Sequence, residues 1–314
     1  MLARVANNLF WMGRYIERAE HTARFLHVNY FSSLDAPNKI SQSKQFVLNS
    51  IMRMVGEIID EDVELNEKEV LFNVGLNPDK HYSILSNIRA ARENANSARD
   101  LISTEIYESI NKFYHFVTNY SLEVFVKRGL YDFAVSSTDN CAVCRGKIRG
   151  TLLHDEVYAL IMLGSNLERA TQITRIIKTK HMDAFKSTGS YNNPVYNSFE
   201  WTTLLKCCES YDMMRRFYKK APTSLNTLEF LILNPYCPRS VMNSLNQAYN
   251  HINVLDVGKI NDKNSAAFLV GKMRSEYQFK RIDEIDVDIT TFIKNTLDML
   301  VEIGVKLEHE YFNY

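Results

Sequence analysis

The stretch Asn7–Tyr30, NNLFWMGRYIERAEHTARFLHVNY, decides the fold, because it predicts a helix that is apolar on two sides. At 100° per residue, seven of its residues follow the spacing of a single apolar seam that faces a core. The opposite side carries four more large apolar side chains. A helix with two apolar sides is buried, so we expect it at the centre of the protein. The seam consists of Leu9, Met12, Ile16, Ala19, Ala23, Leu26 and Tyr30, and the second side of Phe10, Trp11, Phe25 and Val28.

The same stretch carries many charges among these apolar residues. Arg14, Glu17, Arg18, His21 and Arg24 all lie within three turns of the expected helix. If the helix is central, these side chains are at least partly withdrawn from water. An isolated buried charge is very costly, so each of them needs an ionic or hydrogen-bonding partner.

The pattern of this helix returns in the middle of the chain. Residues 162–177, MLGSNLERATQITRII, align with residues 11–26, WMGRYIERAEHTARFL, at an offset of 151, and a second echo relates the Asn-Pro at 234–235 to the one at 77–78. Two echoes in the same order indicate a duplication. We expect two related helical halves, 1–150 and 151–314, packed as one domain with their Glu-Arg helices close together about an approximate two-fold. The identical pairs are Gly13/Gly164, Glu17/Glu168, Arg18/Arg169, Ala19/Ala170 and Arg24/Arg175.

The composition favours an all-α protein, a multi-helix bundle. The 314 residues include only 11 Gly and 6 Pro, and 46% of them are hydrophobic, while strand-like alternation is nearly absent. We expect about ten to twelve helices. Single helices are predicted over about 42–59, over 199–219 and from 286 to the C-terminus, with the final aromatic residues packed back on the bundle.

Charge and cysteine usage limit the possible settings. Lys and Arg number 37, as do Asp and Glu, so the chain has no global field that would draw it to nucleic acid or a membrane. Arg4, Asn7 and Asn8 stand where a secretory signal would be apolar, and no apolar stretch is long enough to span a membrane. Five cysteines, an odd number, fit reduced thiols. We expect a cytoplasmic protein.

Several familiar chemistries are missing from the sequence. No His has an acidic residue three positions before it, as a di-iron bundle requires, and HExxH, GxxxxGK[ST], GxGxxG and GxSxG do not occur. Cys141 and Cys144 form a CxxC without a second pair, which favours packing thiols over a zinc site. The acidic residues 60–69 are interpreted as a solvated turn. We therefore expect no metal and no cofactor.

Two interpretations of the Glu-Arg motif remain open. Neighbouring residues on a helix point about 100° apart, so Glu17 cannot simply neutralise Arg18. If the two motifs meet, Glu17 would pair with Arg169 and Glu168 with Arg18, as a structural cross-brace. We give this interpretation the greater weight.

The alternative is a ligand pocket, because the two copies differ. The first has Arg14, Tyr15, Glu20 and His21 where the second has Ser165, Asn166, Thr171 and Gln172. A brace would need both copies alike, whereas a pocket could use the richer helix. Its arginines would favour a carboxylate or phosphate, and Glu17 or His21 could act as a base. The candidate binding residues are Arg14, Glu17, Arg18, Arg24, Arg92, Arg99, Asp155, Glu156, Glu168 and Arg169.

Five blocks of the sequence resemble the α-E family, bacterial all-helical proteins named for a Glu-Arg motif. They are residues 7–24, 88–111, 150–156, 167–175 and 229–241. The resemblance implies a setting beside, or fused to, circularly permuted ATP-grasp-like ligases and near transglutaminase-like cysteine peptidases. It therefore suggests the making or trimming of peptide or amide bonds. The chain departs from the family pattern at Ser165 and Asn166, where Arg-Tyr is usual, and at His154, where Arg is common.

Together these observations give a leading hypothesis and two alternatives. The leading hypothesis is a helical accessory protein that acts with an ATP-grasp-type peptide ligase and presents an Arg/Glu-lined groove to a carboxylate or phosphate. The first alternative is an enzyme of peptide or amide metabolism with Glu17 or His21 as its base. The second is a scaffold in which the Glu-Arg pairs only fix helix register.

Overall fold

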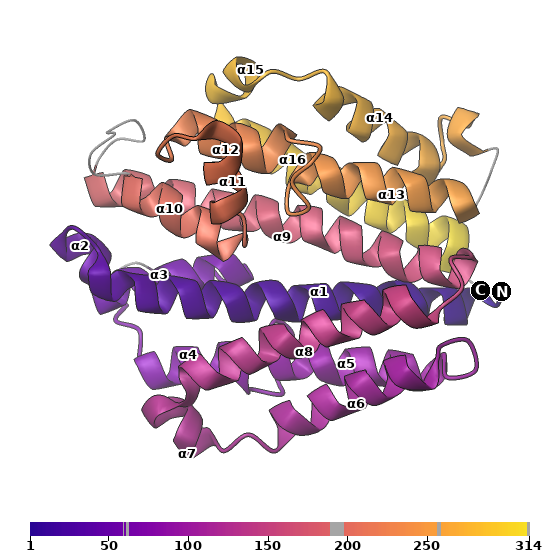
Figure 1. Cartoon of the computed structure of the whole chain (residues 1–314), viewed down its shortest axis with the longest axis horizontal. Coiled ribbons are helices and arrows are strands. Elements are labelled where there is room, and N and C mark those ends of the chain that lie inside the picture. Colours follow the sequence, from indigo (N-terminus) through magenta and orange to yellow (C-terminus); the bar gives the residue numbers. More distant parts are fainter. Residues whose placement is uncertain (59, 61–62, 189–197, 256–258, 313–314) are drawn as a thin grey trace.

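Two long helices run side by side through the middle of the molecule. In the computed structural model, which describes all residues except 59, 61–62, 189–197, 256–258 and 313–314, these are α1 (Ala3–Ser32) and α9 (Glu156–Thr188). Figure 1 shows them running in the same direction, with most of the first half on one side and most of the second half on the other. The described part of the chain is all-α, with sixteen α-helices and no strand.

The remaining helices cover these two. In the first half, α5 (Ile84–Ser97) and α8 (Leu130–Thr151) pack on α1, and in the second half α13 (Val241–Leu255) and α16 (Ile289–Leu307) pack on α9. The other elements of the first half are α2 (Lys39–Gln42), α3 (Lys44–Val55), α4 (Glu67–Gly75), α6 (Thr104–Thr118), α7 (Leu122–Val124), the 3-10 turn η1 (Ser33–Asp35) and the π-helix η2 (Phe125–Gly129). Those of the second half are α10 (Ser198–Cys207), α11 (Tyr211–Tyr218), α12 (Ser224–Leu233), α14 (Ala266–Gln278), α15 (Ile282–Asp286), the 3-10 turn η3 (Lys259–Asn261) and the π-helix η4 (Glu308–Phe312).

The predicted central position of the first helix is confirmed. Every seam residue of α1 except Tyr30 is buried, and so are Phe10 and Phe25 on its second apolar side. The remaining two of that side, Trp11 and Val28, are partly buried against the core. Burial on both sides explains why this helix needs apolar residues almost all round.

Two glycines allow the backbones of α1 and α9 to approach closely. A Cβ on Gly13 would overlap the carbonyl oxygen of Ile161, and a Cβ on Gly164 would overlap that of Phe10. Each glycine therefore lets its helix touch the backbone of the other. Because these equivalent glycines share one crossing, the two Glu-Arg dipeptides come together one turn further along both helices.

Some predicted boundaries are wrong. The helix expected over 42–59 ends at Val55, because Gly56 takes a positive φ of 92° and caps it. The helix expected over 199–219 is two helices, α10 and α11, separated where Glu209 adopts a φ of 52°. Breaks of this kind raise the number of helices above the predicted ten to twelve. They depend on single residues in left-handed conformation, which hydrophobic periodicity does not reveal.

The last turn of the chain packs back on the bundle, as predicted. Phe312 is buried, with its ring 5.1 Å from that of Phe10 on α1. The helix before it begins at Ile289 rather than at 286, because the Asp288 side chain accepts a hydrogen bond from the Thr291 backbone. This C-terminal segment closes one side of the α1–α9 pair.

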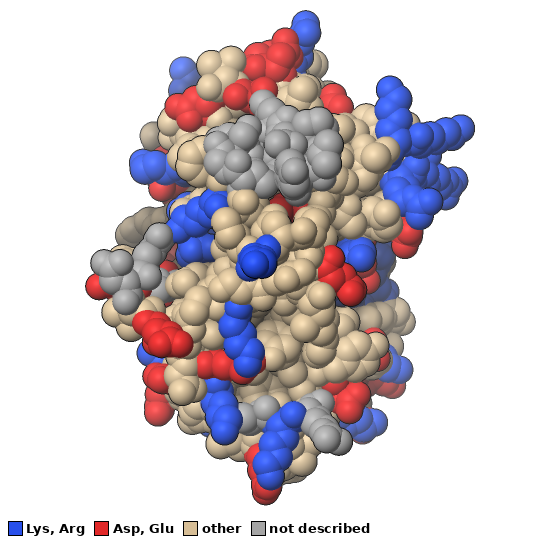
Figure 2. All heavy atoms as spheres, turned by 90° about the vertical axis from the view of Figure 1, so that its left-hand side faces the viewer, with Lys and Arg blue, Asp and Glu red and all other residues tan. Residues whose placement is uncertain are grey.

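Charges of both signs lie on the face of the molecule shown in Figure 2. Figure 2 shows acidic and basic side chains interspersed over much of one face, apart from Lys and Arg gathered at one edge. Within the described residues, no helix is both long enough and apolar enough to cross a membrane. The same residues include no cluster of three or more His, Cys, Asp or Glu placed to hold a metal ion. All five cysteines are buried and unpaired.

Candidate functional site

Both predicted cross-bridges between α1 and α9 are present. Arg18 donates from Nε and Nη2 to the two oxygens of Glu168, at 2.7 and 3.0 Å. Arg169 donates in the same bidentate way to Glu17, at 2.6 and 2.8 Å. Both carboxylates are buried, so each depends on an arginine of the other helix. Their mutual dependence fixes the register of the pair, as the brace interpretation requires.

Glu168 has two further partners. Arg14 donates to it from Nε at 2.8 Å, and Gln172, one turn later on α9, donates at 2.7 Å. Burial alone would raise the pKa of Glu168, but Arg18 and Arg14 outweigh it and hold that pKa far below its usual value. Glu168 is therefore a fixed anion.

Glu17 is held by a comparable set on the other side of the helix pair. Besides Arg169, it accepts from His21 at 3.1 Å and from Arg239, just before α13, at 3.3 Å. Burial would raise the pKa of Glu17, yet Arg169, with His21 and Arg239, lowers it well below its ordinary value. Glu17 is thus also an anion that does not readily accept a proton.

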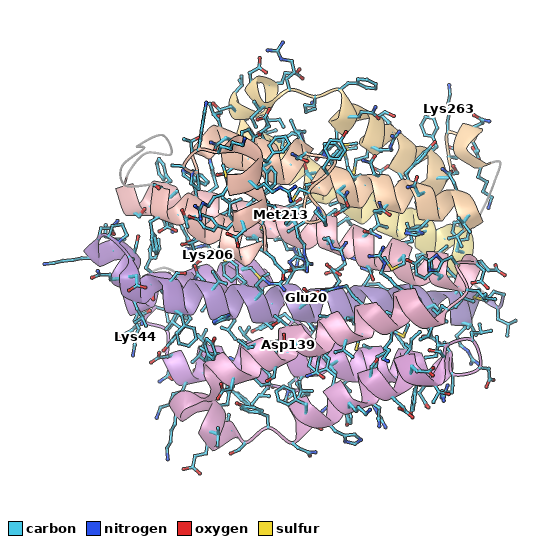
Figure 3. The ribbon with its side chains drawn as sticks, in the orientation of Figure 1. Glu20, Lys44, Asp139, Lys206, Met213 and Lys263 are labelled. Atoms are coloured by element: carbon cyan, nitrogen blue, oxygen red, sulfur yellow. The ribbon has the colours of Figure 1, made fainter. Side chains whose placement is uncertain are left out.

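Glu20 extends this network into the interior. Figure 3 places its side chain near the middle of α1. It accepts from Arg239 at 2.6 Å and Arg24 at 2.9 Å, and it is ion-paired with Arg145 of α8. Arg239 and Arg24 also reach Glu209, whose side chain is exposed. Four elements of the fold therefore meet around one buried carboxylate.

The two halves use different residues for the same contacts. His21 on α1 and Gln172 on α9 occupy equivalent positions, and each hydrogen-bonds the motif glutamate one turn before it. Asn166 accepts from Arg169 at 3.3 Å, where its equivalent Tyr15 stacks its ring against Arg18 instead. The premise that a brace needs identical copies is therefore wrong, because different side chains can make equivalent hydrogen bonds.

His21 should make stability depend on pH. Burial lowers the pKa of His21 from 6.5 to about 4, although Glu17 favours its charged form. Between these values the unfolded chain binds a proton that the folded chain does not, so stability falls as the pH falls. Replacing His21 by Gln, as at position 172, should keep the hydrogen bond to Glu17. The loss of unfolding free energy between about pH 7 and about pH 5 should then shrink by about 1 to 2 kcal/mol.

Urea unfolding at the two pH values measures this effect. His115→Gln, a change on the exposed face of α6, is the matched control and should leave the pH dependence as in the wild type. An equal loss of stability in His21→Gln and in the wild type would contradict a neutral, buried His21.

Two cavities flank the braced pair. The arginine groove, of about 340 Å³, lies against α8 and the turn before α13. The α16 pocket, of about 210 Å³, lies under α16 and η4. The groove is lined by the charged residues Glu17, Arg145, Arg149, Arg169 and Arg239, and the pocket by Arg14, Arg18, Glu168, Arg175 and Glu308.

Five of the candidate binding residues line neither cavity, and one of them, Arg24, is bound to Glu20 instead. Arg92 donates to Asn111 of α6 at 2.7 Å, and Arg99, just after the end of α5, donates to Thr104 at 3.2 Å. Asp155 caps the start of α9 by accepting from the Val157 backbone, and Glu156 is exposed in the first turn of that helix. Four other arginines line the cavities beside the Glu-Arg residues: Arg145, Arg149, Arg175 and Arg239.

The sequence holds a signal for only two of these four arginines. Arg239 lies in the block 229–241 that carries the family resemblance, and Arg175 is identical to Arg24 in the repeat. Arg145 and Arg149 belong to α8, which has no repeat partner among the aligned segments. Their role depends on tertiary packing alone.

A helical bundle built on paired Glu-Arg dipeptides defines the class of this protein. The chain matches a family model over residues 1–312, and that model, Alpha-E, is described as a predicted alpha-helical domain with a conserved ER motif. The chain therefore belongs to the Alpha-E family. No curated protein and no solved structure matched it.

Proposed function

We propose that this protein is a helical accessory protein whose arginine groove holds a carboxylate or phosphate group for an ATP-grasp-type peptide ligase. The observation that carries the proposal is the charge of the groove lining. Four arginines and one glutamate line it, and the glutamate is already bound by Arg169 and Arg239. The lining thus has an excess of guanidinium groups, which suit planar, bidentate recognition of such anions.

One of these arginines is available to a ligand, and a second, Arg145, is ion-paired with Glu20 but has further donors. Arg149 is exposed and forms no ion pair with any described residue. Burial, and then repulsion by Arg239, lowers the pKa of Arg145 to about 10. A bound anion would offset that repulsion, because it places negative charge among the crowded cations.

The ligase partnership is supported by the family resemblance. Members of the family occur beside or fused to circularly permuted ATP-grasp-like ligases, and near transglutaminase-like peptidases. A ligase that forms peptide or amide bonds consumes a carboxylate, which is the group that the groove suits. An accessory protein could present either the substrate or an acidic segment of the ligase itself.

The enzyme alternative has less support. A general base near neutral pH needs a pKa close to the working pH and access to the substrate. Glu17 lines the groove, but its pKa lies well below the ordinary value. His21 is fully buried, with a pKa of about 4. The scaffold alternative accounts for the cross-bridges but leaves the unpaired Arg149 without a role.

Calorimetric titration with short acidic peptides tests the proposal. Arg149→Gln should weaken binding about tenfold, because one charge-assisted hydrogen bond is lost. Arg89→Gln, a change of another exposed arginine, on α5, is the control and should bind as the wild type does. C-terminally amidated peptides with Gln in place of Glu should not bind, and binding should weaken as salt is added.

A pull-down with the neighbouring ligase tests the partnership separately. Capture of the ligase by the wild type, and weaker capture by Arg149→Gln, is the expected result. Absence of binding to both the ligase and the acidic peptides would overturn the proposed function.

A further inference from the structure

One arginine of the α16 pocket, Arg175, feels the charge of Glu168 but is not hydrogen-bonded to it. Arg175 is half-buried and makes no hydrogen bond or ion pair with any described residue. Its equivalent on α1, Arg24, bonds Glu20 one turn before it at 2.9 Å. On α9 the corresponding position is Thr171, which also lines the pocket. The second half therefore has the cation but not the carboxylate.

The other two arginines of the pocket have donors to spare. A guanidinium carries five N–H donors, of which Arg14 uses one and Arg18 two on Glu168. Arg14 is also held in place, with its guanidinium 4.6 Å from the ring of Trp11 and 5.6 Å from that of Phe10. The donors are thus positioned before any ligand arrives.

Apart from Thr171, Glu168 and Glu308, the rest of the pocket wall is apolar. Leu300, Val301 and Val305 contribute one side from α16, and Phe312 of η4 and Trp11 of α1 contribute the others. A purely inorganic anion would leave this wall facing water. A ligand with a short apolar body would cover it and gain about 25 cal/mol per Å² of apolar surface buried.

The charges of the lining leave one cation in excess. Three arginines face Glu168 and Glu308, and Glu168 is fully engaged by Arg14, Arg18 and Gln172. We propose that the α16 pocket binds a small organic anion, a carboxylate head on a short apolar body, with Arg175 pairing the head. The volume of about 210 Å³ limits the ligand to roughly the size of an amino acid. This site is distinct from the arginine groove.

Titration of the full chain with 3-phenylpropionate tests the proposal, with calorimetry and the fluorescence of Trp11 as readouts. The neutral amide, 3-phenylpropionamide, should bind at least about tenfold more weakly, because it lacks the charge that pairs with Arg175. Inorganic phosphate, which lacks the apolar body, should also bind more weakly. Equal binding of the acid and either probe would overturn the ligand class.

Two substitutions test the role of Arg175. Thr171→Glu restores the carboxylate that Glu20 supplies on α1, so it should occupy Arg175 and weaken 3-phenylpropionate binding at least about tenfold while the fold is retained. Arg175→Gln should weaken binding to a similar extent. Arg149→Gln, in the arginine groove, should leave it unchanged. Wild-type affinity in Thr171→Glu and Arg175→Gln, or no binding of 3-phenylpropionate by the wild type, would show that the pocket is not this site.

Discussion

Arg18→Met should lower the free energy of unfolding by about 3 to 5 kcal/mol, since it removes one side of a buried ion pair. Arg18 makes two of the four hydrogen bonds that Glu168 accepts, and the Glu168 side chain is only 1% exposed. After the change, Arg14 and Gln172 remain as its only described partners. The Glu168 carboxylate then stays buried with only two of its four hydrogen bonds.

Urea unfolding measures the loss, and Arg4→Met is the matched control, because Arg4 is exposed in the first turn of the same helix. Surface changes of that kind usually shift stability by no more than about 0.5 kcal/mol. The double variant Arg18→Met/Glu168→Gln should be less destabilised than the sum of the single changes, since no carboxylate is stranded.

The Arg18–Glu168 pair should also make the free energy of unfolding depend on pH. The pKa of Glu168 lies far below its usual value in the folded chain, so its stabilising contribution is present above about pH 4 and is lost as the pH falls further. Arg18→Met should lose most of this contribution at any pH. The stability difference between wild type and variant should therefore shrink on acidification. A difference that stays constant down to about pH 2 would contradict the assigned role of Glu168.

The sequence was sufficient to predict the central pair and its cross-bridges. The apolar seam of α1 indicated burial, and the repeat at an offset of 151 indicated which residues would meet. The contacts Glu17–Arg169 and Arg18–Glu168 follow from these two facts together. The duplication itself stays a prediction, because equivalent contacts do not by themselves establish common descent.

The composition of the cavities could not be predicted in the same way. Arg239 is more than two hundred residues away from Glu17 in the chain, and it reaches Glu17 through the turn before α13. Periodicity describes one helix at a time and says nothing about which turn of another element will face it. Arg92, a candidate binding residue on α5, bonds Asn111 of α6, although α5 also packs on α1.

Lys180→Met should also lower the free energy of unfolding by about 3 to 5 kcal/mol, because it strands buried carboxylates. Lys180 is 2% exposed and donates to Asp183 at 3.0 Å and Asn29 at 3.1 Å, and it is ion-paired with Glu200 at 2.6 Å. Burial would lower the pKa of Lys180, but Glu200 and Asp183 outweigh it and raise that pKa. This cluster joins α9 to α10 and α1 beyond the Glu-Arg pairs.

Lys180→Met leaves Asp183 and Glu200 with different hydrogen-bonding partners. Asp183 keeps Arg53 at 2.7 Å and Ser50 at 2.6 Å, whereas Glu200 keeps only the hydroxyl of Ser41 at 3.0 Å among the described residues. A carboxylate left with one neutral partner in an apolar interior is more stable when protonated. The destabilisation should therefore be larger at about pH 7 than at about pH 5, the same direction as the change expected for Arg18→Met on acidification.

Urea unfolding at both pH values tests this, with Lys178→Met, an exposed lysine two residues earlier on α9, as the control. Lys180→Met/Glu200→Leu should recover part of the lost stability, because removing both charges of a buried pair costs less than removing one. If Lys180→Met were no less stable than Lys178→Met, the cluster around Lys180 would be too well hydrated to tie α10 to the central pair. The cross-bridges would then be the main ionic contacts that hold α9 in place.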